Sequence, residues 1–175
     1  MQPKLGLVVG KFAPPHKGHQ LVIDTALEAC DRVIVLVYDN PDFPEMPVHA
    51  RADWLRAAYS NRSDLEVFVP QNAPENDADD FTQREFVRLW LTERDFKPDM
   101  VFGSENYIAG FAAHIGASPV VVDLERLRVP TSGTEVRNIW RAYRESVKYV
   151  NDPPLFYTTP GDLELFAELE ARVSY

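Results

Sequence analysis

The sequence has little cysteine, a shortage of positive charge and no long apolar run. Its 175 residues include one cysteine, Cys30, which excludes an internal disulfide and which we expect to be a small buried apolar residue. The formal net charge is -9, from 27 acidic and 18 basic residues. Because wrapping a nucleic-acid backbone requires clustered excess Lys and Arg, we expect no nucleic-acid partner.

The apolar segments are all short. A membrane-spanning helix needs about 20 consecutive apolar residues, and no run here approaches that length. Residues 1–30 also lack the arrangement of a signal peptide. We therefore expect a cytoplasmic protein with no membrane partner. The length and the absence of repeats predict one domain over residues 1–175, with 150–175 as a C-terminal loop and helix extension.

What the sequence does contain is an alternation of short apolar runs and amphipathic segments. Apolar, β-branched runs predict strands near 4–9, 32–38, 65–69, 99–102 and 120–122. Helical periodicity predicts helices near 17–29, 49–60, 81–95, 105–115, 133–148 and 160–173. The expected N-caps are Asp80 for the helix near 81–95, Ser104 for the helix near 105–115 and Thr159 for the helix near 160–173. Gly116 is expected to end the helix near 105–115. The alternation indicates an α/β fold with a doubly wound, mostly parallel five-stranded sheet.

The first candidate site lies where the first strand joins the first helix. Gly10 ends the strand, and Lys11 and Phe12 follow it. The helix then starts with His16, Lys17, Gly18 and His19. Ligands bind at this edge of a parallel sheet, and the free N–H groups of a helix's first turn attract anions. Imidazole can donate hydrogen bonds to phosphate oxygens, whereas two histidines are too few to hold zinc, so we predict a phosphate site without a protein-held metal.

A second candidate site opens the helix near 133–148. Ser132, Gly133 and Thr134 offer hydroxyls and free N–H groups, and Arg137 can reach the same anion as a bidentate donor. Two more polar segments follow the fourth and second strands, namely Ser104, Glu105 and Tyr107, and Tyr38, Asp39 and Asn40. Taken alone, each of these segments is equally typical of an ordinary helix cap or loop.

Together, the first two motifs resemble the nucleotidylyltransferase superfamily. Its HxGH motif is matched by residues 16–19, and its serine–threonine–arginine motif by residues 132–137. Within the superfamily, the chain is most similar to nicotinamide mononucleotide adenylyltransferases of the NadR type, over residues 5–145. Supporting positions are Gly10, Lys11, Phe12, Tyr38, Asp39, Arg51, Trp54, Leu55 and residues 103–107. The resemblance implies a Rossmann-like nucleotidylyltransferase fold.

Two features depart from the NadR type. Those proteins follow the arginine with an Asn-Pro pair, whereas Asn138 precedes Ile139 here, although Trp140 and Tyr143 remain. The kinase domain and the DNA-binding module of larger relatives have no counterpart, so we expect neither activity. The resemblance therefore indicates the type of reaction more specifically than it indicates the acceptor substrate.

The resemblance implies that the phosphate of a mononucleotide, most simply nicotinamide mononucleotide, attacks the α-phosphorus of ATP and expels pyrophosphate. It assigns catalytic roles to His16, His19, Lys11 and Arg137. It assigns binding of the ATP co-substrate, with Mg²⁺ on its phosphates, to Gly10, Phe12, Gly18, Ser132, Gly133 and Thr134. It assigns acceptor binding to Asp39, Arg51, Ser104, Glu105 and Tyr107.

Several alternatives stay open at this level. Phosphopantetheine, flavin mononucleotide or a phosphoalcohol would serve the same motifs as acceptors, and a sensing module would bind ATP without turnover. A class I tRNA synthetase fragment shares the HxGH signature, but the acidic charge and short length argue against it. A homo-oligomer is compatible with the sequence. Residues 70–80 are predicted to be a polar, acidic and mobile loop, and its closure over substrate is a hypothesis that the sequence leaves open.

Overall fold

In the computed structural model, residues 4–39, 43–147 and 172 are described. The strands are β1 (Leu5–Gly10), β2 (Arg32–Val37), β3 (Leu65–Phe68), β4 (Met100–Gly103) and β5 (Ser118–Val121). The helices are α1 (Lys17–Ala29), α2 (Val48–Ala58), α3 (Asp80–Glu93), α4 (Ile108–Ile115) and α5 (Gly133–Val147). The loop predicted at 150–158 and the helix predicted at 160–173 lie outside the described residues, apart from position 172.

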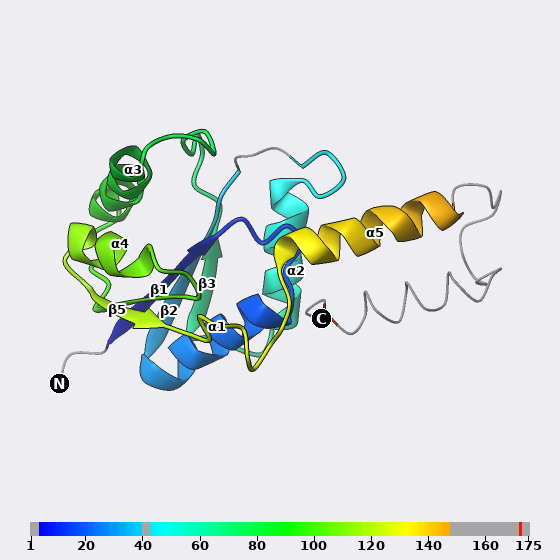
Figure 1. Cartoon of the computed structure of the whole chain (residues 1–175). Helices are drawn as coiled ribbons and strands as arrows, with labels where there is room; N and C mark the ends of the chain where they lie inside the picture. The colour runs from blue at the N-terminus through cyan, green and yellow to red at the C-terminus, as the bar shows by residue number, and fades with distance from the viewer. Residues whose placement is uncertain (1–3, 40–42, 148–171, 173–175) are drawn as a thin grey trace.

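The strands form one parallel sheet in the order β3-β2-β1-β4-β5 (Figure 1). The chain builds outward from β1 through β2 to β3 and then crosses to β4 on the other side of β1. The strand order therefore reverses between β1 and β4, and the carboxyl ends of those two strands flank a crevice of the kind that binds ligands. The predicted doubly wound, Rossmann-like fold is confirmed.

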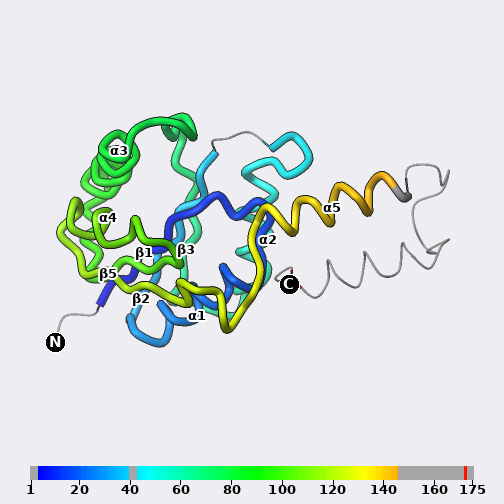
Figure 2. Tube along the Cα trace, in the orientation of Figure 1, coloured from blue at the N-terminus to red at the C-terminus, as the bar shows by residue number. Residues whose placement is uncertain are grey.

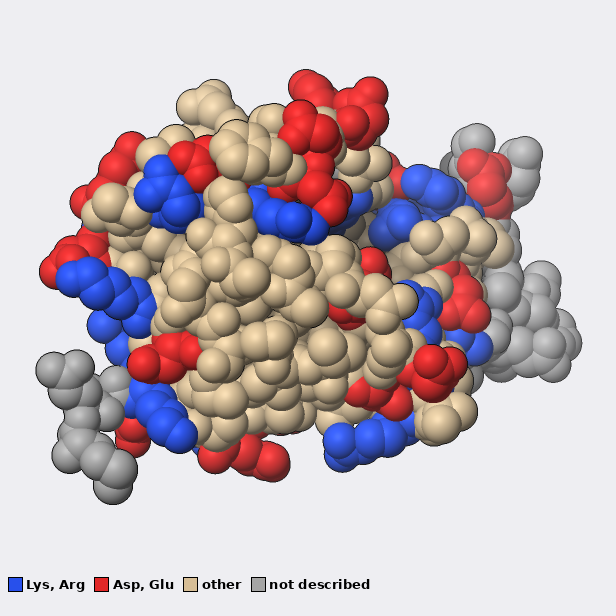
Figure 3. Space-filling model, turned by 60° about the vertical axis from the view of Figure 1, so that its left-hand side comes forward, with Lys and Arg blue, Asp and Glu red and all other residues tan. Residues whose placement is uncertain are grey.

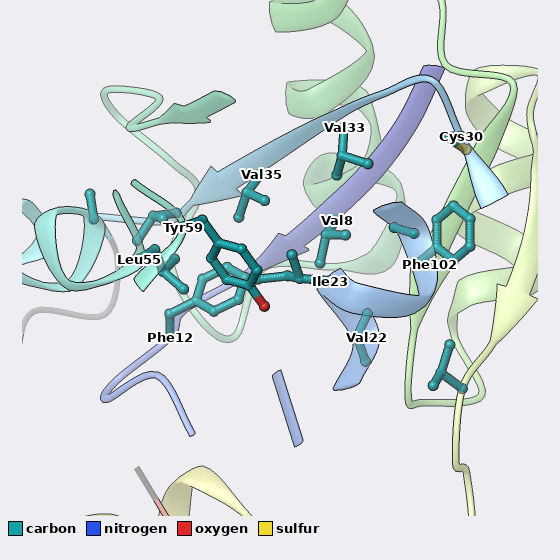
Figure 4. Packing of buried hydrophobic residues seen from close by; sticks show 14 residues of the cluster. Val8, Phe12, Val22, Ile23, Cys30, Val33, Val35, Leu55, Tyr59 and Phe102 are labelled. Carbon is teal, nitrogen blue, oxygen red and sulfur yellow. The ribbon is translucent and has the colours of Figure 1, made fainter. Parts of the chain in front are cut away.

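Helices cover both faces of the sheet, with α1 and α2 on one side and α3 and α4 on the other (Figure 1). Side chains of successive strand residues point to opposite faces, so Val33 and Val35 pack with α1 and α2, whereas Ile34 and Leu36 pack with α3 and α4. Figure 4 shows the first of these clusters, in which Phe12 from the turn after β1 lies against Leu55 and Tyr59. That turn is therefore anchored in the core.

Three predicted element boundaries are wrong. The N-cap of α3 is Asp79 rather than Asp80, because the Asp79 carboxylate accepts a hydrogen bond from the Thr82 N–H at 2.9 Å. Helix α4 begins at Ile108, so Ser104 is not its cap and residues 104–107 remain a loop on the sheet edge. Strand β5 is displaced toward the N-terminus because its pairing with β4 runs from Ser118 to Val121.

The buried face of α1 is made of Val22, Ile23 and Ala26, whereas Ala29 near its end is exposed. The helix packs between the sheet and Tyr59 of the α2 end, and its buried face turns accordingly. Two other predictions are confirmed: Cys30 is buried, and Gly116 ends α4 in the left-handed conformation with φ 78°. Within the described ranges, no helix is both long and apolar enough to cross a membrane.

Candidate active site

The turn after β1 is held by the ring of Phe12. This residue has a positive φ of 48°, which is costly for a bulky side chain, but the ring is almost fully buried and holds the backbone there. A Cβ on Gly10 would lie 3.2 Å from that ring, which is a tight contact, so a glycine lets the ring approach without a shift. The ring of His19 also packs against Phe12, with the two ring centroids 4.7 Å apart.

The two histidines of the first motif are stacked, with ring centroids 3.7 Å apart. His16 is the N-cap of α1, and its Nδ1 accepts a hydrogen bond from the Gly18 N–H at 3.2 Å. Because Nδ1 accepts, the neutral ring carries its proton on Nε2. A Cβ added at Gly133 would lie 3.8 Å from that Nε2, so the N–H of His16 faces the start of α5. The Nδ1 of His19 is buried and has no hydrogen-bond partner among the described residues.

The second motif lies directly against the first. Arg137, one turn into α5, donates from Nη1 to the carbonyl of Ala13 at 2.8 Å and from Nη2 to the Thr134 hydroxyl at 3.1 Å. Figure 2 shows the turn after β1 running beside the segment that enters α5. Two segments far apart in the sequence are thus joined into one anion-binding corner with two helix N-termini, as the pairing of motifs predicts.

Two adjoining pockets occupy this corner. The larger has a volume of about 490 Å³. Predicted site residues on its wall are Gly10, Lys11, Phe12, His19, Ser104, Glu105, Tyr107, Ser132, Gly133, Thr134 and Arg137. The smaller, of about 100 Å³, contains His16 and Gly18 on its wall. The two share His19, Ser104, Glu105, Arg126, Ser132 and Gly133, so they meet at the motifs themselves.

The cationic side chains that line the larger pocket include Lys11, Arg126 and Arg137, and Arg126 also lines the smaller one. Burial, reinforced by the Arg137 charge, lowers the pKa of Lys11, and Glu105 partly offsets that effect. Burial together with Arg126 and Arg137 lowers the pKa of His16 to about 4. Burial, His16 and the same two arginines hold the pKa of His19 well below 6.5. Both rings are therefore neutral near pH 7, and a bound anion would relieve the mutual repulsion of the cations.

This cationic lining contrasts with the outer surface. On the face shown in Figure 3, acidic and basic side chains are interspersed around a wide uncharged area, with no continuous basic stripe among the coloured atoms. A polyanion would find no extended track on that face, whereas a small phosphate compound would find its counter-charges inside the pockets.

Arg126 is a candidate site residue that the sequence reasoning missed. It lines both pockets and its charge lowers the pKa of both histidines. Its loop is folded by Asp123, whose carboxylate accepts hydrogen bonds from the N–H groups of Arg128 at 3.0 Å and Val129 at 2.9 Å. The available signal was a basic residue in the loop that leads into the second motif.

Two predicted acceptor-binding residues do not line either pocket. Arg51 is fully buried and donates to the backbone carbonyls of Met46 at 2.8 Å, Tyr38 at 3.0 Å and Lys11. The carboxylate of Asp39 accepts from the backbone N–H groups of Asn72 and Ala73, each at 3.1 Å. In this structure both residues hold loops at the pocket rim in place. Asn40, predicted beside them, lies outside the described residues.

The predicted polar loop forms part of the larger pocket. Pro74, Asn76 and Ala78 line that pocket, and the Lys11 ammonium donates to the side-chain oxygen of Asn76. Gln83 of α3 donates to the carbonyl of Glu75 at 2.7 Å, which ties the loop to the helix. Closure of residues 70–80 over substrate stays a prediction.

The described residues contain no group of three or more His, Cys, Asp or Glu side chains arranged to hold a metal ion. The side chains that line both pockets include a single carboxylate, that of Glu105, beside His19, Arg126 and the hydroxyls of Ser104 and Ser132. That donor set suits a divalent ion that enters on a polyphosphate and takes its ligands from phosphate oxygens and water.

Comparison with known proteins agrees with this geometry. The sequence matches the family described as cytidylyltransferase-like over residues 7–139. The chain belongs to the cytidylyltransferase-like family. Both motifs of the corner lie inside the matched range, so the resemblance to the nucleotidylyltransferase superfamily is confirmed.

The relatives that match over most of this chain share low sequence identity with it. The chain is 25% identical over 150 residues to the trifunctional NAD biosynthesis/regulator protein NadR of Salmonella typhimurium, covering 78% of this chain and 37% of that protein. It is 29% identical over 133 residues to the bifunctional protein HldE of Gluconacetobacter diazotrophicus, covering 70% of this chain and 25% of that protein. The chain thus spans well under half the length of the curated relatives it matches.

A solved structure shares the fold. A bifunctional NMN adenylyltransferase/ADP ribose pyrophosphatase from Francisella tularensis, complexed with AMP and a Mn ion, aligns with a TM-score of 0.60 at 19% identity. The alignment covers 97% of this chain and 50% of that one. At this identity the likeness concerns the fold alone.

Proposed function

We propose that this chain transfers the adenylyl group of ATP to the phosphate of a mononucleotide, with nicotinamide mononucleotide as the foremost acceptor, giving NAD and pyrophosphate. The observation that carries the proposal is the junction of the two pockets. There the two motifs and two helix N-termini meet beside Arg126, and Lys11 and Arg137 line the adjoining larger pocket. A reaction between two phosphate compounds requires such a junction, because the two substrates meet at their phosphates.

The chemistry asked of the protein is positioning and charge stabilisation. The attacking phosphate oxygen is already anionic, so no general base is required. The phosphoryl oxygens gather negative charge as the bond to pyrophosphate breaks, and preorganised donors stabilise that charge most effectively. His16, whose Nε2–H faces α5, and His19 supply neutral donors, and Lys11 and Arg137 supply cationic ones. Ser132 and Thr134 complete the cradle at the start of α5.

A divalent ion belongs to this scheme as part of the nucleotide substrate. Magnesium on the triphosphate would neutralise part of its charge, with phosphate oxygens as ligands. Among the residues that line both pockets, Ser104, Glu105 and Ser132 carry side-chain oxygens that could reach the ion or its bound water. The protein donors act on the phosphate oxygens that the ion leaves free.

The larger pocket supports a planar acceptor base. Tyr38, Tyr107 and Phe111 lie on its wall and offer aromatic surface, while Gln83 and Asn76 offer amide groups. The similarity to NadR, a protein named for NAD biosynthesis, points to the same acceptor. We propose that residues 4–147 contain the whole of this site and act as one domain.

A different acceptor is the second candidate, because a stretch of 38 residues is 47% identical to a phosphopantetheine adenylyltransferase of Fusobacterium nucleatum, over 22% of this chain and 23% of that protein. Flavin mononucleotide, phosphopantetheine and phosphoalcohols would meet the same donors at their phosphates. A sensing module that binds ATP without turnover would use the same corner, but it would have no need for every donor of both motifs.

The test is pyrophosphate release from ATP and Mg²⁺ in the presence of one acceptor at a time. Nicotinamide mononucleotide, nicotinic acid mononucleotide, flavin mononucleotide and phosphopantetheine would be compared side by side. The proposal predicts the highest kcat/KM with nicotinamide mononucleotide. A higher kcat/KM with flavin mononucleotide or phosphopantetheine would identify that compound as the acceptor in place of nicotinamide mononucleotide. Binding of ATP with no pyrophosphate release in the presence of any acceptor would support the sensing module.

A further inference from the structure

The ring of Phe43, between β2 and α2, lies between an arginine of α2 and the arginine of the second motif in α5. The ring of Phe43 receives two guanidinium groups: the Cζ of Arg137 lies 5.1 Å from its centroid and the Cζ of Arg51 lies 5.4 Å from it. Phe43 itself is half-buried and lines neither pocket. We call these three side chains the Arg51–Phe43–Arg137 stack.

One end of the stack is fixed. Arg51 has no exposed surface, and its guanidinium donates to the carbonyls of Lys11 and Tyr38, which follow β1 and β2, and to that of Met46. The Met46 N–H in turn donates to the carbonyl of Phe43 at 2.7 Å, which closes a tight turn just before α2. The position of the Phe43 ring is thus set by the same buried charge that holds the backbone of Lys11.

The other end of the stack is the arginine of the second motif. A second contact keeps the segment on α5, because Arg141, one turn after Arg137, donates to the Glu45 carboxylate at 3.1 Å. Hydrogen bonding to its own backbone and to Arg141 lowers the pKa of Glu45, so this partner is ionised. The segment from Phe43 to Met46 therefore bridges α2 and α5, with the ring placed beneath Arg137.

We propose that Phe43 is a positioning residue, which holds the Arg137 guanidinium toward the pocket and fixes its place relative to the Lys11 turn. This proposal rests on the proposed function, in which Arg137 is a cationic donor, and it takes the leaving pyrophosphate as the group that Arg137 binds. An arginine side chain has several rotatable bonds, and the hydrogen bonds of the Arg137 guanidinium to the Ala13 carbonyl and the Thr134 hydroxyl fix its edge but leave its two faces uncovered by them. The ring face restricts it, and the attraction of a cation to a π face operates only with an aromatic side chain.

The test compares Phe43→Ala, Phe43→Leu and Phe43→Tyr in the ATP and nicotinamide mononucleotide reaction. Alanine and leucine should each lower kcat about tenfold, the size expected for a partly desolvated cation–π contact, and tyrosine should restore it. The KM for the acceptor should stay within about twofold, because the ring does not line the acceptor pocket. Leucine retains most of the packing volume and keeps a folded variant available if alanine unfolds. A leucine variant with wild-type kcat would overturn the proposal.

A double-mutant cycle separates positioning from a general loss of structure. In an Arg137→Ala background, Phe43→Ala should change kcat less than about twofold, since the group that it positions is gone. A further tenfold loss in that background contradicts the proposal. Phe81→Ala is the matched control, because Phe81 is an exposed phenylalanine of α3 outside both pockets, and it should leave kcat unchanged.

Binding of inorganic pyrophosphate, measured by calorimetry, distinguishes failure of this proposal from failure of the proposed function. If no acceptor supports turnover but pyrophosphate binds about tenfold more weakly to Phe43→Leu than to Phe43→Tyr, the positioning role stands while the reaction fails. Equal pyrophosphate affinity in all three variants and the wild type would reject the positioning role whatever the reaction.

Discussion

Replacing Arg137 by lysine separates the charge at this position from the geometry of its hydrogen bonds. The guanidinium donates to the Ala13 carbonyl and the Thr134 hydroxyl at the same time, and its remaining N–H groups are available to a ligand. An ammonium keeps the charge but cannot reproduce that planar set of donors. Loss of one preorganised donor to developing negative charge costs a factor of about 10² to 10³ in kcat. We expect Arg137→Lys to approach the lower value and Arg137→Ala the upper.

The histidine next to Arg137 supplies an independent readout. The Arg137 charge is one cause of the low pKa of His16, which lies at about 4. Arg137→Ala should therefore raise the pKa of His16 toward 6.5, whereas Arg137→Lys should leave it low. Steady-state pyrophosphate release gives the kcat ratio, and an NMR titration of the imidazole gives the pKa. A lysine variant with near-normal kcat, or an alanine variant with an unchanged His16 pKa, would refute this reasoning.

Three further predictions concern single side chains. His19→Ala should lower kcat by about 10²-fold while its thermal unfolding temperature stays near that of the wild type. His49→Ala, which changes an exposed histidine, should leave kcat unchanged. Normal turnover by a folded His19 variant would show that His19 is not part of the site. Because the folded pKa of His16, about 4, is below 6.5, the unfolded chain binds more protons between these values. The free energy of unfolding should thus fall by about 3 kcal/mol as the pH drops through that window, and urea titrations of His16→Gln should lack that part of the slope. Arg51→Met should cost about 3 kcal/mol or more of stability by stranding buried carbonyls, whereas the exposed Arg56→Met should cost far less; equal urea midpoints would contradict the buried network.

The fold was largely predictable because its signals are local. Val33–Val37 is a continuous apolar run, and the structure buries these residues completely in β2, an interior strand of the sheet. The errors arose where two local signals compete. Asp79 and Asp80 both satisfy the rule for an N-cap, and only the hydrogen bond to Thr82 decides between them. Ser104 also looks like a cap, but the chain needs residues 104–107 to turn from β4 into α4.

The site was predictable where motifs supply it and unpredictable where distant contacts supply it. His16, His19 and Arg137 converge as their motifs indicate. The buried role of Arg51 depends on carbonyls that three separate segments bring to it, and no sequence pattern reports such a meeting. Arg126 was missed for a related reason, since its place over both pockets depends on the Asp123 turn that folds its loop.

The most direct test of the central proposal follows the label of ATP. The purified protein would be incubated with Mg²⁺, nicotinamide mononucleotide and ATP carrying radioactive phosphorus at the α-position or, separately, at the γ-position. Adenylyl transfer predicts that the α-label appears in NAD and the γ-label in pyrophosphate, and that the His19→Ala variant forms both products about 10²-fold more slowly. Transfer of the γ-label to the acceptor, or retention of the α-label in ADP, would contradict it.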